Sequence, residues 1–453
     1  MSVRFARAPV AARDGGVPNP AQPVRSRLAG MLSAWLCALP ATDDIGGPSM
    51  LGPRRILLSY DAPFAGLKVV DLSQGIAGPY CGMMLAQHGA NVIKVETTEG
   101  AGDWSRGLGV RYGNHSVFSI VGNMGKRSVA LNLKTEAGRD VLWRLLDEAD
   151  VFMEGFRPGV IKRLGFDYEA VSARVPRLLY VSISGFGQSG PLAERPATDP
   201  VLQAYTGMMV ENRGEDGIPH RVPVIVVDMS TALYAFQAVS AALYARRDQP
   251  RGRFIEISLM QAAAALQSIR MMACHLEGGT MKPGAVPGGV FKTADGWISM
   301  AVINDRDWLA MCEAMELPQL GRDERFATPA ARVADPEALY AIVRPALAAR
   351  PTQHWAERFG AARLMYERLN SYAEFMAQPH VEATRLIHWL NQPGMTQPVP
   401  MPILPGAVMP ADGTPGATAP VCGQHTEAVL REHGYSPDEI SGLMAGGAIA
   451  SAR

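Results

Sequence analysis

Asp228 is the residue whose position most suggests chemistry. It follows an apolar run at 222–227 and precedes a long apolar-periodic stretch at 229–247. We predict a buried strand and then a helix, which places Asp228 at the carboxyl end of a strand, where open α/β sheets bind ligands. Aspartate directly before a helix is also a favoured N-cap. Two interpretations stay open: a helix cap, or a nucleophile whose carboxylate the helix amides keep ionised.

A second carboxylate, Asp199, lies in the segment ATDPV. It can act as a base or as an orienting acid, whereas an aspartate before proline is ordinarily a turn residue. The histidines do not cluster at metal-ligand spacings, and no G-x-S-x-G segment marks a serine nucleophile. We therefore expect carboxylate chemistry without a metal.

The glycine-rich segment GFGQSGP, at 185–191, matches the dinucleotide fingerprint G-x-G-x-x-G. That fingerprint needs a helix directly after it, so that backbone amides meet a pyrophosphate. Pro191, Pro196 and Pro200 interrupt the following residues, and a long helix cannot begin there. We interpret the segment as a tight turn at the rim of an active site.

The elements that position these residues alternate between short apolar runs and amphipathic helices, one of them capped by Thr135. This alternation predicts an α/β fold with a parallel sheet covered on both faces. A second long helix is expected at 261–275. The predicted strands are 67–72, 90–96, 128–133, 149–153, 178–184 and 253–259.

Later segments follow a different pattern. The run VFKTADGWISMAV, after residue 289, is hairpin-like and is followed by helices, which is typical of a separate α+β domain. A last amphipathic helix, 425–433, is expected to close the chain. Basic residues near the predicted strand ends suit either a phosphate-bearing ligand or a solvated face; they are Arg106, Lys126, Arg127, Lys134, Arg157 and Arg163.

Composition excludes several classes of protein. The 43 basic and 43 acidic residues balance, which disfavours nucleic-acid binding. Five scattered cysteines without a C-x-x-C pair indicate a reducing cytoplasm and no thiolate metal site. The sequence contains no run of about 18 or more uncharged apolar residues, so we predict no membrane-spanning helix.

Several motifs in one order resemble a known family: LKVVDLSQGIAGPYCGMMLAQHGANVIKVE, GDWSRG, GKRSVALNLKTEAG, FMEGFRPGVIKRLGF, SISGFGQSGP, GRFIEISL and GQHTEAVLREHGYS. Together they resemble the family III CoA-transferases, to which α-methylacyl-CoA racemase is related. The resemblance runs from residue 67 to the end of the chain. Residues 1–62 lie outside it, and we expect them to form a disordered or extended tail.

The resemblance implies that Asp228 is the nucleophile. It would attack a donor acyl-CoA thioester, giving an aspartyl anhydride and then an aspartyl-CoA thioester, from which an incoming carboxylic acid takes CoA. Gln74, Ile76 and Ala77 occupy positions that contact the thioester end, and Asp199 would help to orient the reacting groups. Formyl-CoA transferase has a glutamine where this chain has Ile76, so Gln74 or a backbone amide must supply the oxyanion donor.

The resemblance also assigns residues to CoA, which is expected as a substrate, with no permanently bound cofactor. One phosphate contact is missing, because formyl-CoA transferase has an arginine where this chain has Thr97. The matching positions near the adenine, phosphates and pantetheine are Ile76, Ala77, Thr97, Leu131, Lys134, Gly155, Phe156 and Arg163.

The family fold implies a Rossmann-like large domain, here 63–285 and 385–453, with a small α+β domain, 286–384, inserted into it. It further implies an interlocked homodimer. A racemase on the same scaffold is the alternative, but the position that holds its histidine base is Thr198 here, which favours transfer. An inactive acyl-CoA-binding relative is the other alternative, suggested by Ile76 and Thr97.

Overall fold

The structure is a computed structural model that describes residues 62–214, 216–279 and 281–452. The expected tail at 1–62 lies outside the described residues except for its last position. The described residues all belong to one compact unit, which contains every element below.

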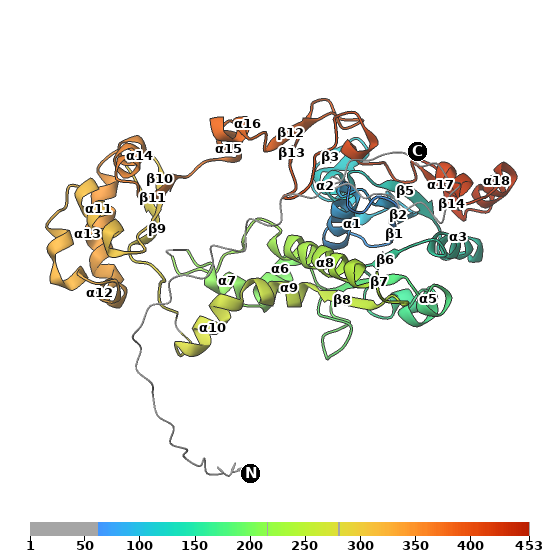
Figure 1. Ribbon diagram of the computed structural model, residues 1–453, viewed down its shortest axis with the longest axis horizontal. Helices are drawn as coiled ribbons and strands as arrows, with labels where there is room; N and C mark the ends of the chain where they lie inside the picture. Colours follow the sequence, from blue (N-terminus) through green and yellow to red (C-terminus); the bar gives the residue numbers. More distant parts are fainter. Residues whose placement is uncertain (1–61, 215, 280, 453) are drawn as a thin grey trace, which may run out of the picture. The chain divides into compact units, whose positions relative to one another are not determined.

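A seven-stranded sheet organises most of this unit, in the order β14-β5-β2-β1-β6-β7-β8 (Figure 1). All neighbours are parallel except β14, which pairs antiparallel with β5. The predicted parallel sheet is therefore confirmed. Its strands are β1 (Lys68–Asp71), β2 (Asn91–Thr97), β5 (Arg127–Leu131), β6 (Val151–Glu154), β7 (Leu179–Ser184), β8 (Phe254–Ser258) and β14 (Ile449–Ala450).

Both faces of this sheet are buried, because successive side chains of each strand point to opposite faces. Val69 joins one hydrophobic cluster and Val70 joins the other. The first cluster includes α1 (Ala77–Gln87), α2 (Val117–Asn123), α6 (Asp199–Tyr205), α8 (Val226–Ala245) and α9 (Leu259–Leu266). The second includes α3 (Glu136–Leu146), α5 (Tyr168–Arg174), α17 (Thr426–Glu432) and α18 (Pro437–Ala445).

Two predictions at helix ends have different outcomes. Thr135 caps α3 as expected, since its hydroxyl accepts a hydrogen bond from the amide of Gly138 at 3.1 Å. The expectation that the helix at 425–433 closes the chain is wrong, because α18 and β14 follow it. Ser436 and Glu439 form a capping box at the start of α18, a signal that the sequence carries.

The segment at 222–227 is not a strand. Its last two residues already belong to α8, and the edge of the sheet is occupied by β8 instead. Pro223 has no amide hydrogen for a sheet ladder, and Val224 is 53% exposed, so the apolar residues before Val226 form a loop that leads into the helix. Asp228 therefore lies inside the first turn of α8 and not at the end of a strand.

The helix expected at 261–275 is interrupted. It forms α9 and α10 (Ser268–Leu276), with Gln267 between them in a non-helical conformation. The Gln267 side-chain amide donates to the Ala263 carbonyl and to the Thr206 hydroxyl, both at 3.0 Å. These bonds hold the break in place.

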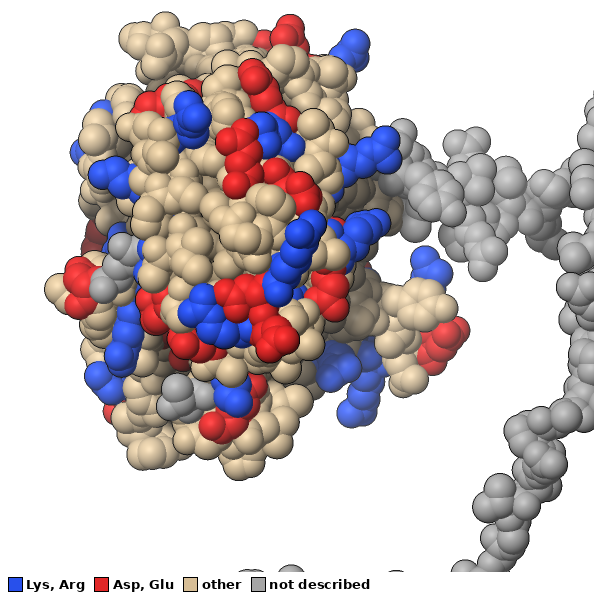
Figure 2. Space-filling view, turned by 90° about the vertical axis from the view of Figure 1, so that its left-hand side faces the viewer, with Lys and Arg blue, Asp and Glu red and all other residues tan. Residues whose placement is uncertain are grey.

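Residues 286–366 contain a third hydrophobic cluster around Phe291, Trp308 and Phe359. The predicted hairpin is present as β9 and β10, which form an antiparallel sheet with β11. Acidic and basic side chains are interspersed over the face shown in Figure 2. The domain limits 286 and 384 stay predictions. The elements are β9 (Gly288–Lys292), β10 (Trp297–Ala301), α11 (Asp305–Ala314), α12 (Pro329–Ala334), α13 (Pro336–Ala348), α14 (Thr352–Ala361) and β11 (Met365–Arg368).

Shorter elements complete the described chain, namely β3 (Arg111–Tyr112), β4 (His115–Ser116), α4 (Val160–Arg163), α7 (Met208–Glu211), α15 (Tyr372–Met376), α16 (Pro379–Ala383), β12 (Ile387–Leu390) and β13 (Val399–Pro402). Within the described ranges, α8 is the one helix whose length and hydropathy would allow a membrane span. Its residues Val227, Ala235 and Val239 are fully buried in the first cluster, as in the core helix of an α/β protein.

Candidate active site

The strand order places a crevice at the carboxyl ends of β1 and β6. These neighbouring strands mark the point where the strand order reverses, which is where open α/β sheets bind ligands. The loop after β1, from Ser73 to Gly78, and the loop after β6, from Gly155 to Pro158, line a cavity of about 340 Å³. Asp228 lines the same cavity. The fold thus brings Ser73 and Asp228, which are far apart in the sequence, to the same cavity.

The surroundings of Asp228 change the pKa of its carboxyl group. Burial, and secondarily the negative charge of Asp199, raise the pKa of Asp228 to about 7. The N-cap of α8 is Ile225, so the interpretation of Asp228 as the cap is wrong. The interpretation that helix amides keep Asp228 ionised is also wrong, because those amides bind another carboxylate.

That carboxylate is Asp199, at the start of α6. Its Oδ2 accepts hydrogen bonds from the amides of Val227, at 2.7 Å, and Asp228, at 3.2 Å. Its Oδ1 accepts from the Gln203 side chain at 2.7 Å. Asp199 is buried and fixes the first turn of α8, and it does not itself line the cavity.

The loop after β1 carries Gln74, Ile76 and Ala77 into the cavity wall. Gly75 lies between them with a φ of +81°, a conformation that favours glycine, and a Cβ there would lie 2.3 Å from the Trp104 ring. The Gly75 amide donates to Asp103 Oδ1 at 3.0 Å. This turn aims Gln74 at the cavity and lets α1 begin at Ala77.

Two buried ion pairs support the loop after β1. Lys94 and Asp103 pair at 2.9 Å, and Lys126 and Asp71 pair at 2.7 Å, with all four side chains fully buried. Lys94 also donates to the Ser73 carbonyl. Burial lowers the pKa of Lys126 to about 8, although Asp71 opposes this effect. The interpretation of Lys126 as a ligand contact or a solvated residue is therefore wrong.

A second cavity, of about 190 Å³, adjoins the first, since Gln74 and Phe156 line both. Its walls include Thr97, Leu131 and Lys134, which the sequence assigned to CoA. The Lys134 ammonium lies 2.7 Å from Glu99, and both side chains are exposed. A ligand that extends from Lys134 past Phe156 would reach the cavity of Asp228.

Other predicted residues lie elsewhere. Arg163, on α4, is exposed and lines neither cavity. Arg106 is buried against Glu96 at 2.7 Å, and Arg127 pairs with Glu432 at 2.6 Å. Arg157 does line the cavity of Asp228.

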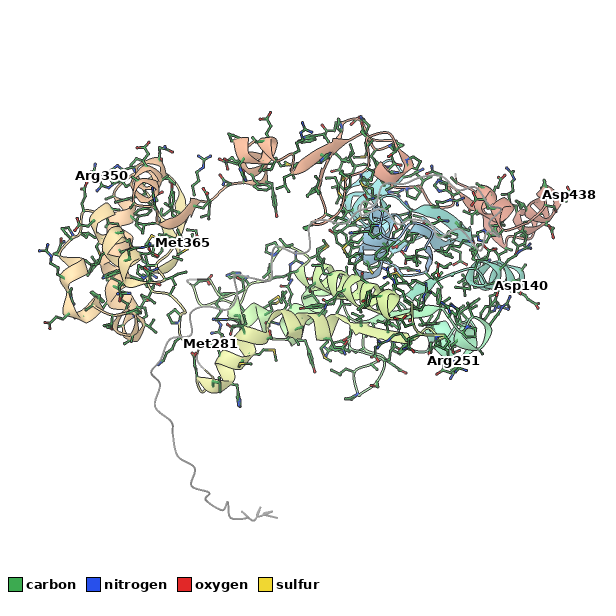
Figure 3. The ribbon with its side chains drawn as sticks, viewed as in Figure 1. Asp140, Arg251, Met281, Arg350, Met365 and Asp438 are labelled. Carbon is green, nitrogen blue, oxygen red and sulfur yellow. The ribbon has the colours of Figure 1, made fainter. Side chains whose placement is uncertain are left out.

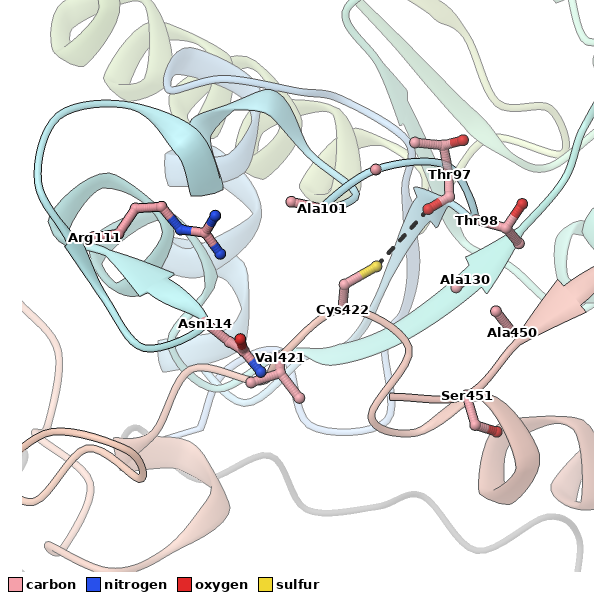
Figure 4. A pocket seen from close by; sticks show the side chains of 11 residues that line it. Thr97, Thr98, Ala101, Arg111, Asn114, Ala130, Val421, Cys422, Ala450 and Ser451 are labelled. Carbon is pink, nitrogen blue, oxygen red and sulfur yellow. Dashed lines mark hydrogen bonds between the residues drawn. The ribbon is translucent and has the colours of Figure 1, made fainter. Parts of the chain in front are cut away.

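A third cavity, of about 330 Å³, is also lined by Thr97 (Figure 4). Arg111, Cys422 and Ser451 are among its lining residues, and the Cys422 thiol donates to the Thr97 carbonyl at 3.8 Å. It contains neither Asp228 nor the loop after β1, so we do not count it as part of the candidate active site. The described residues contain no group of three His, Cys, Asp or Glu side chains that could hold a metal ion.

Comparison with known proteins assigns the chain to a family. The sequence profile described as CoA-transferase family III matches residues 64–426. The chain belongs to this family. Acetyl-CoA:oxalate CoA-transferase of Acetobacter aceti is 35% identical over 332 residues, which cover 72% of this chain and 85% of that protein. Human succinyl-CoA:glutarate CoA-transferase is 31% identical over 397 residues, which cover 85% and 90%.

Solved structures of the family have the same fold. A CAIB/BAIF family protein from Brucella suis superposes with a TM-score of 0.72 at 30% identity, covering 82% of this chain and all of that chain. Rv3272 from Mycobacterium tuberculosis superposes with a TM-score of 0.71 at 29% identity, covering 81% and 98%. The α/β architecture and the CoA-transferase character expected from the sequence are thus confirmed.

The sequence missed Arg195, which also lines the cavity of Asp228. It lies between the glycine turn at 185–191 and Asp199, in a proline-rich stretch without periodicity. The glycine turn and Asp199 were both candidate parts of the site. The position of Arg195 between them was therefore the signal that could have identified it.

The raised pKa of Asp228 predicts a stability effect. The native state keeps a proton that the unfolded chain releases at the ordinary value of 3.8, so stability falls as pH rises from about 4 through 7. Asp228→Asn imitates the neutral form. We expect the variant to melt several degrees above the wild-type protein at pH 8 and at nearly the same temperature at pH 4.5.

Differential scanning calorimetry at the two pH values measures this difference. Asp140→Asn is the matched control, because Asp140 is exposed on α3 (Figure 3). An equal shift of both variants at pH 8 would show that general charge removal, and not burial of Asp228, explains the result.

Proposed function

We propose that this protein moves CoA from an acyl-CoA thioester to a carboxylic acid, with Asp228 as the nucleophile. The observation that supports this most is the half-buried Asp228 carboxylate in a cavity that adjoins the one lined by Thr97, Leu131 and Lys134. The second cavity suits the nucleotide end of CoA and the first suits the thioester. The named relatives, which transfer CoA to oxalate or glutarate, support the same reaction class.

The chemistry starts with the ionised Asp228 carboxylate. It attacks the thioester carbonyl and breaks the carbon–sulfur bond, which gives a mixed anhydride and a CoA thiolate. The thiolate attacks the aspartyl carbonyl, releases the donor acid and leaves an aspartyl-CoA thioester. An acceptor carboxylate then reverses these steps, so that the net reaction exchanges one acid for another on CoA and regenerates Asp228.

Two features of the site assist this attack. Binding of the thioester beside Asp228 in one cavity removes most of the entropic barrier to attack by a weak nucleophile. The amides of Ala77 and Gly78 precede the first helical hydrogen bond of α1, from the Tyr80 amide to the Ile76 carbonyl, and are available to stabilise an oxyanion. These amides, together with Gln74, compensate for the apolar side chain of Ile76.

Asp199 acts as a positioning residue in this proposal. It holds the amides of Val227 and Asp228 and thereby fixes the helical turn that carries the nucleophile. Its negative charge also opposes ionisation of Asp228, which makes that carboxylate more basic and more nucleophilic once it is ionised. Thr198, on the cavity wall, carries no basic group, which favours transfer over two-base racemisation.

A trapping experiment tests the proposal. The full chain is incubated with acyl-CoA donors such as acetyl-CoA and succinyl-CoA, treated with hydroxylamine and digested for mass spectrometry. We expect a hydroxamate on the peptide that contains Asp228. Absence of an adduct with every donor, while CoA transfer proceeds, would reject the covalent mechanism; absence of transfer and adduct together would favour an inactive binding relative.

We further propose that the protein is a cytoplasmic homodimer. Ile269, Met272 and Leu276 of α10 are 82%, 65% and 75% exposed, and α10 has no buried residue. Such a cluster of exposed apolar side chains suits a contact between subunits. The described cysteines are all free, which suits a reducing compartment.

Sedimentation velocity tests the dimer. We expect the wild-type protein to sediment as a dimer, and Ile269→Asp combined with Leu276→Asp to sediment as a monomer or to dissociate at micromolar concentration. Arg251→Gln, at an exposed residue outside α10 and just before β8, serves as the control. A monomeric wild-type protein at high concentration would contradict the proposal.

A further inference from the structure

The cavity of Asp228 holds two arginines that have no acidic partner among the described residues. Arg157 and Arg195 both line this cavity and are exposed to it. Arg174 and Arg246, by contrast, each pair with a carboxylate within 2.7 Å. The described contact of the Arg195 guanidinium is with the ring of Phe186, whose centre lies 5.5 Å away. The Phe186 ring thus supports the planar face of the Arg195 guanidinium. The N–H groups along the edges of the guanidinium stay available to bind an anion.

The two arginines belong to different segments of the cavity wall. Arg157 directly follows Phe156, which lines both cavities, so Arg157 belongs to the side where CoA enters. Arg195 lies on the segment that leads through Ala197 and Thr198 to Asp199, beneath the turn that carries Asp228. Because Arg195 lines the cavity of Asp228 and not the second cavity, we assign it to the acid that reacts at Asp228 and not to the nucleotide.

The reaction itself decides which carboxylate suits Arg195. An acceptor carboxylate that attacks the aspartyl-CoA thioester loses its charge, because the negative charge passes to the CoA thiolate. A guanidinium bound to that carboxylate would lose its partner during the step and oppose the reaction. A guanidinium bound to a second carboxylate, which does not react, keeps its partner from binding to release.

We propose that the acceptor is a short aliphatic dicarboxylic acid and that Arg195 binds its distal carboxylate, as the residue that determines acceptor specificity. The inference rests on the proposed CoA transfer at Asp228. The cavity volume of about 340 Å³ also has to hold the thioester end of CoA, which restricts the acid to a short chain.

The acceptor half-reaction tests Arg195 without interference from the donor. The aspartyl-CoA thioester is formed first, freed of donor acid by gel filtration, and mixed with glutarate or with pentanoate, which has the same number of carbons and one carboxylate. The proteins are the wild type, Arg195→Gln, Arg195→Lys and the control Arg251→Gln, whose exposed side chain lies just before β8 (Figure 3).

We expect Arg195→Gln to raise the half-saturating glutarate concentration about 10- to 100-fold, with little change in the maximal rate, since a charged hydrogen bond is lost equally from ground state and transition state. Pentanoate should react equally slowly with wild type and variant, and Arg195→Lys should keep part of the preference. Equal loss for both acids, or a wild-type enzyme that does not prefer glutarate, would overturn the role of Arg195. Failure of the wild type to form any thioester would instead overturn the proposed function, and this inference with it.

Discussion

Replacement of Asp228 by alanine is expected to abolish the covalent adduct and to lower the rate of CoA transfer on the order of 10⁴-fold or more. The described wall of the cavity contains no second carboxylate that could take over the attack. Asp199 is buried behind the first turn of α8 and is committed to two backbone amides. Loss of the proposed nucleophile is therefore expected to leave binding but to remove the covalent route.

Rate and adduct are measured in the same samples, by liquid chromatography of acyl-CoA products and by intact-protein mass spectrometry. Asp228→Asn is a weaker test than alanine, because hydrolysis of the asparagine amide regenerates the carboxylate. Asp140→Asn controls for removal of a surface charge and should keep the full rate. A transfer rate in Asp228→Ala within tenfold of the wild type would exclude this carboxylate as nucleophile.

The sequence predicted the sheet better than the surroundings of Asp228. Residues 151–153, within the predicted strand 149–153, are apolar at every position, and a strand buried on both faces needs that pattern. The run at 222–227 has the same composition but becomes a loop and the first turn of α8. Periodicity cannot separate a short buried strand from the start of a buried helix when the surrounding residues are apolar in both cases.

The sequence pattern could not predict which side chains contact each other. The sequence singled out Asp199 and Asp228 separately, 29 positions apart, and only the fold places the Asp228 amide on the Asp199 carboxylate. Arg195 was missed for the same reason, since its loop has no period of its own. The buried lysine in the strand NVIKVET was a usable signal, because a lysine within an apolar strand of a covered sheet requires an opposite charge nearby.

The buried pair of Lys126 and Asp71 leads to the second large effect. Lys126→Met is expected to destabilise the protein by about 3–5 kcal/mol, because it leaves the Asp71 carboxylate buried without its cation. Lys126 also donates to the Pro79 carbonyl at 2.7 Å, in the first turn of α1. Asp71 in turn accepts from the amide of Ser73 at 3.0 Å, at the base of the loop that carries Gln74.

The surface offers a matched pair of similar geometry. Arg174 and Asp147 lie 2.6 Å apart, close to the 2.7 Å between Lys126 and Asp71, but their side chains are 48% and 40% exposed. Arg174→Met is expected to cost no more than about 1 kcal/mol, because water already stabilises both charges and screens their attraction. Thermal or denaturant unfolding of the two variants compares burial at nearly constant distance.

A double variant separates the lost attraction from the stranded charge. In Asp71→Asn combined with Lys126→Met no uncompensated charge remains, so we expect it to recover at least half of the stability that Lys126→Met loses. If the double variant is instead as unstable as the single one, the cost lies in the hydrogen bonds to Pro79 and Ser73, which fix the active-site loop. In that case the donor half-reaction should slow in both variants, since Gln74 and the first amides of α1 would no longer be held at the cavity wall.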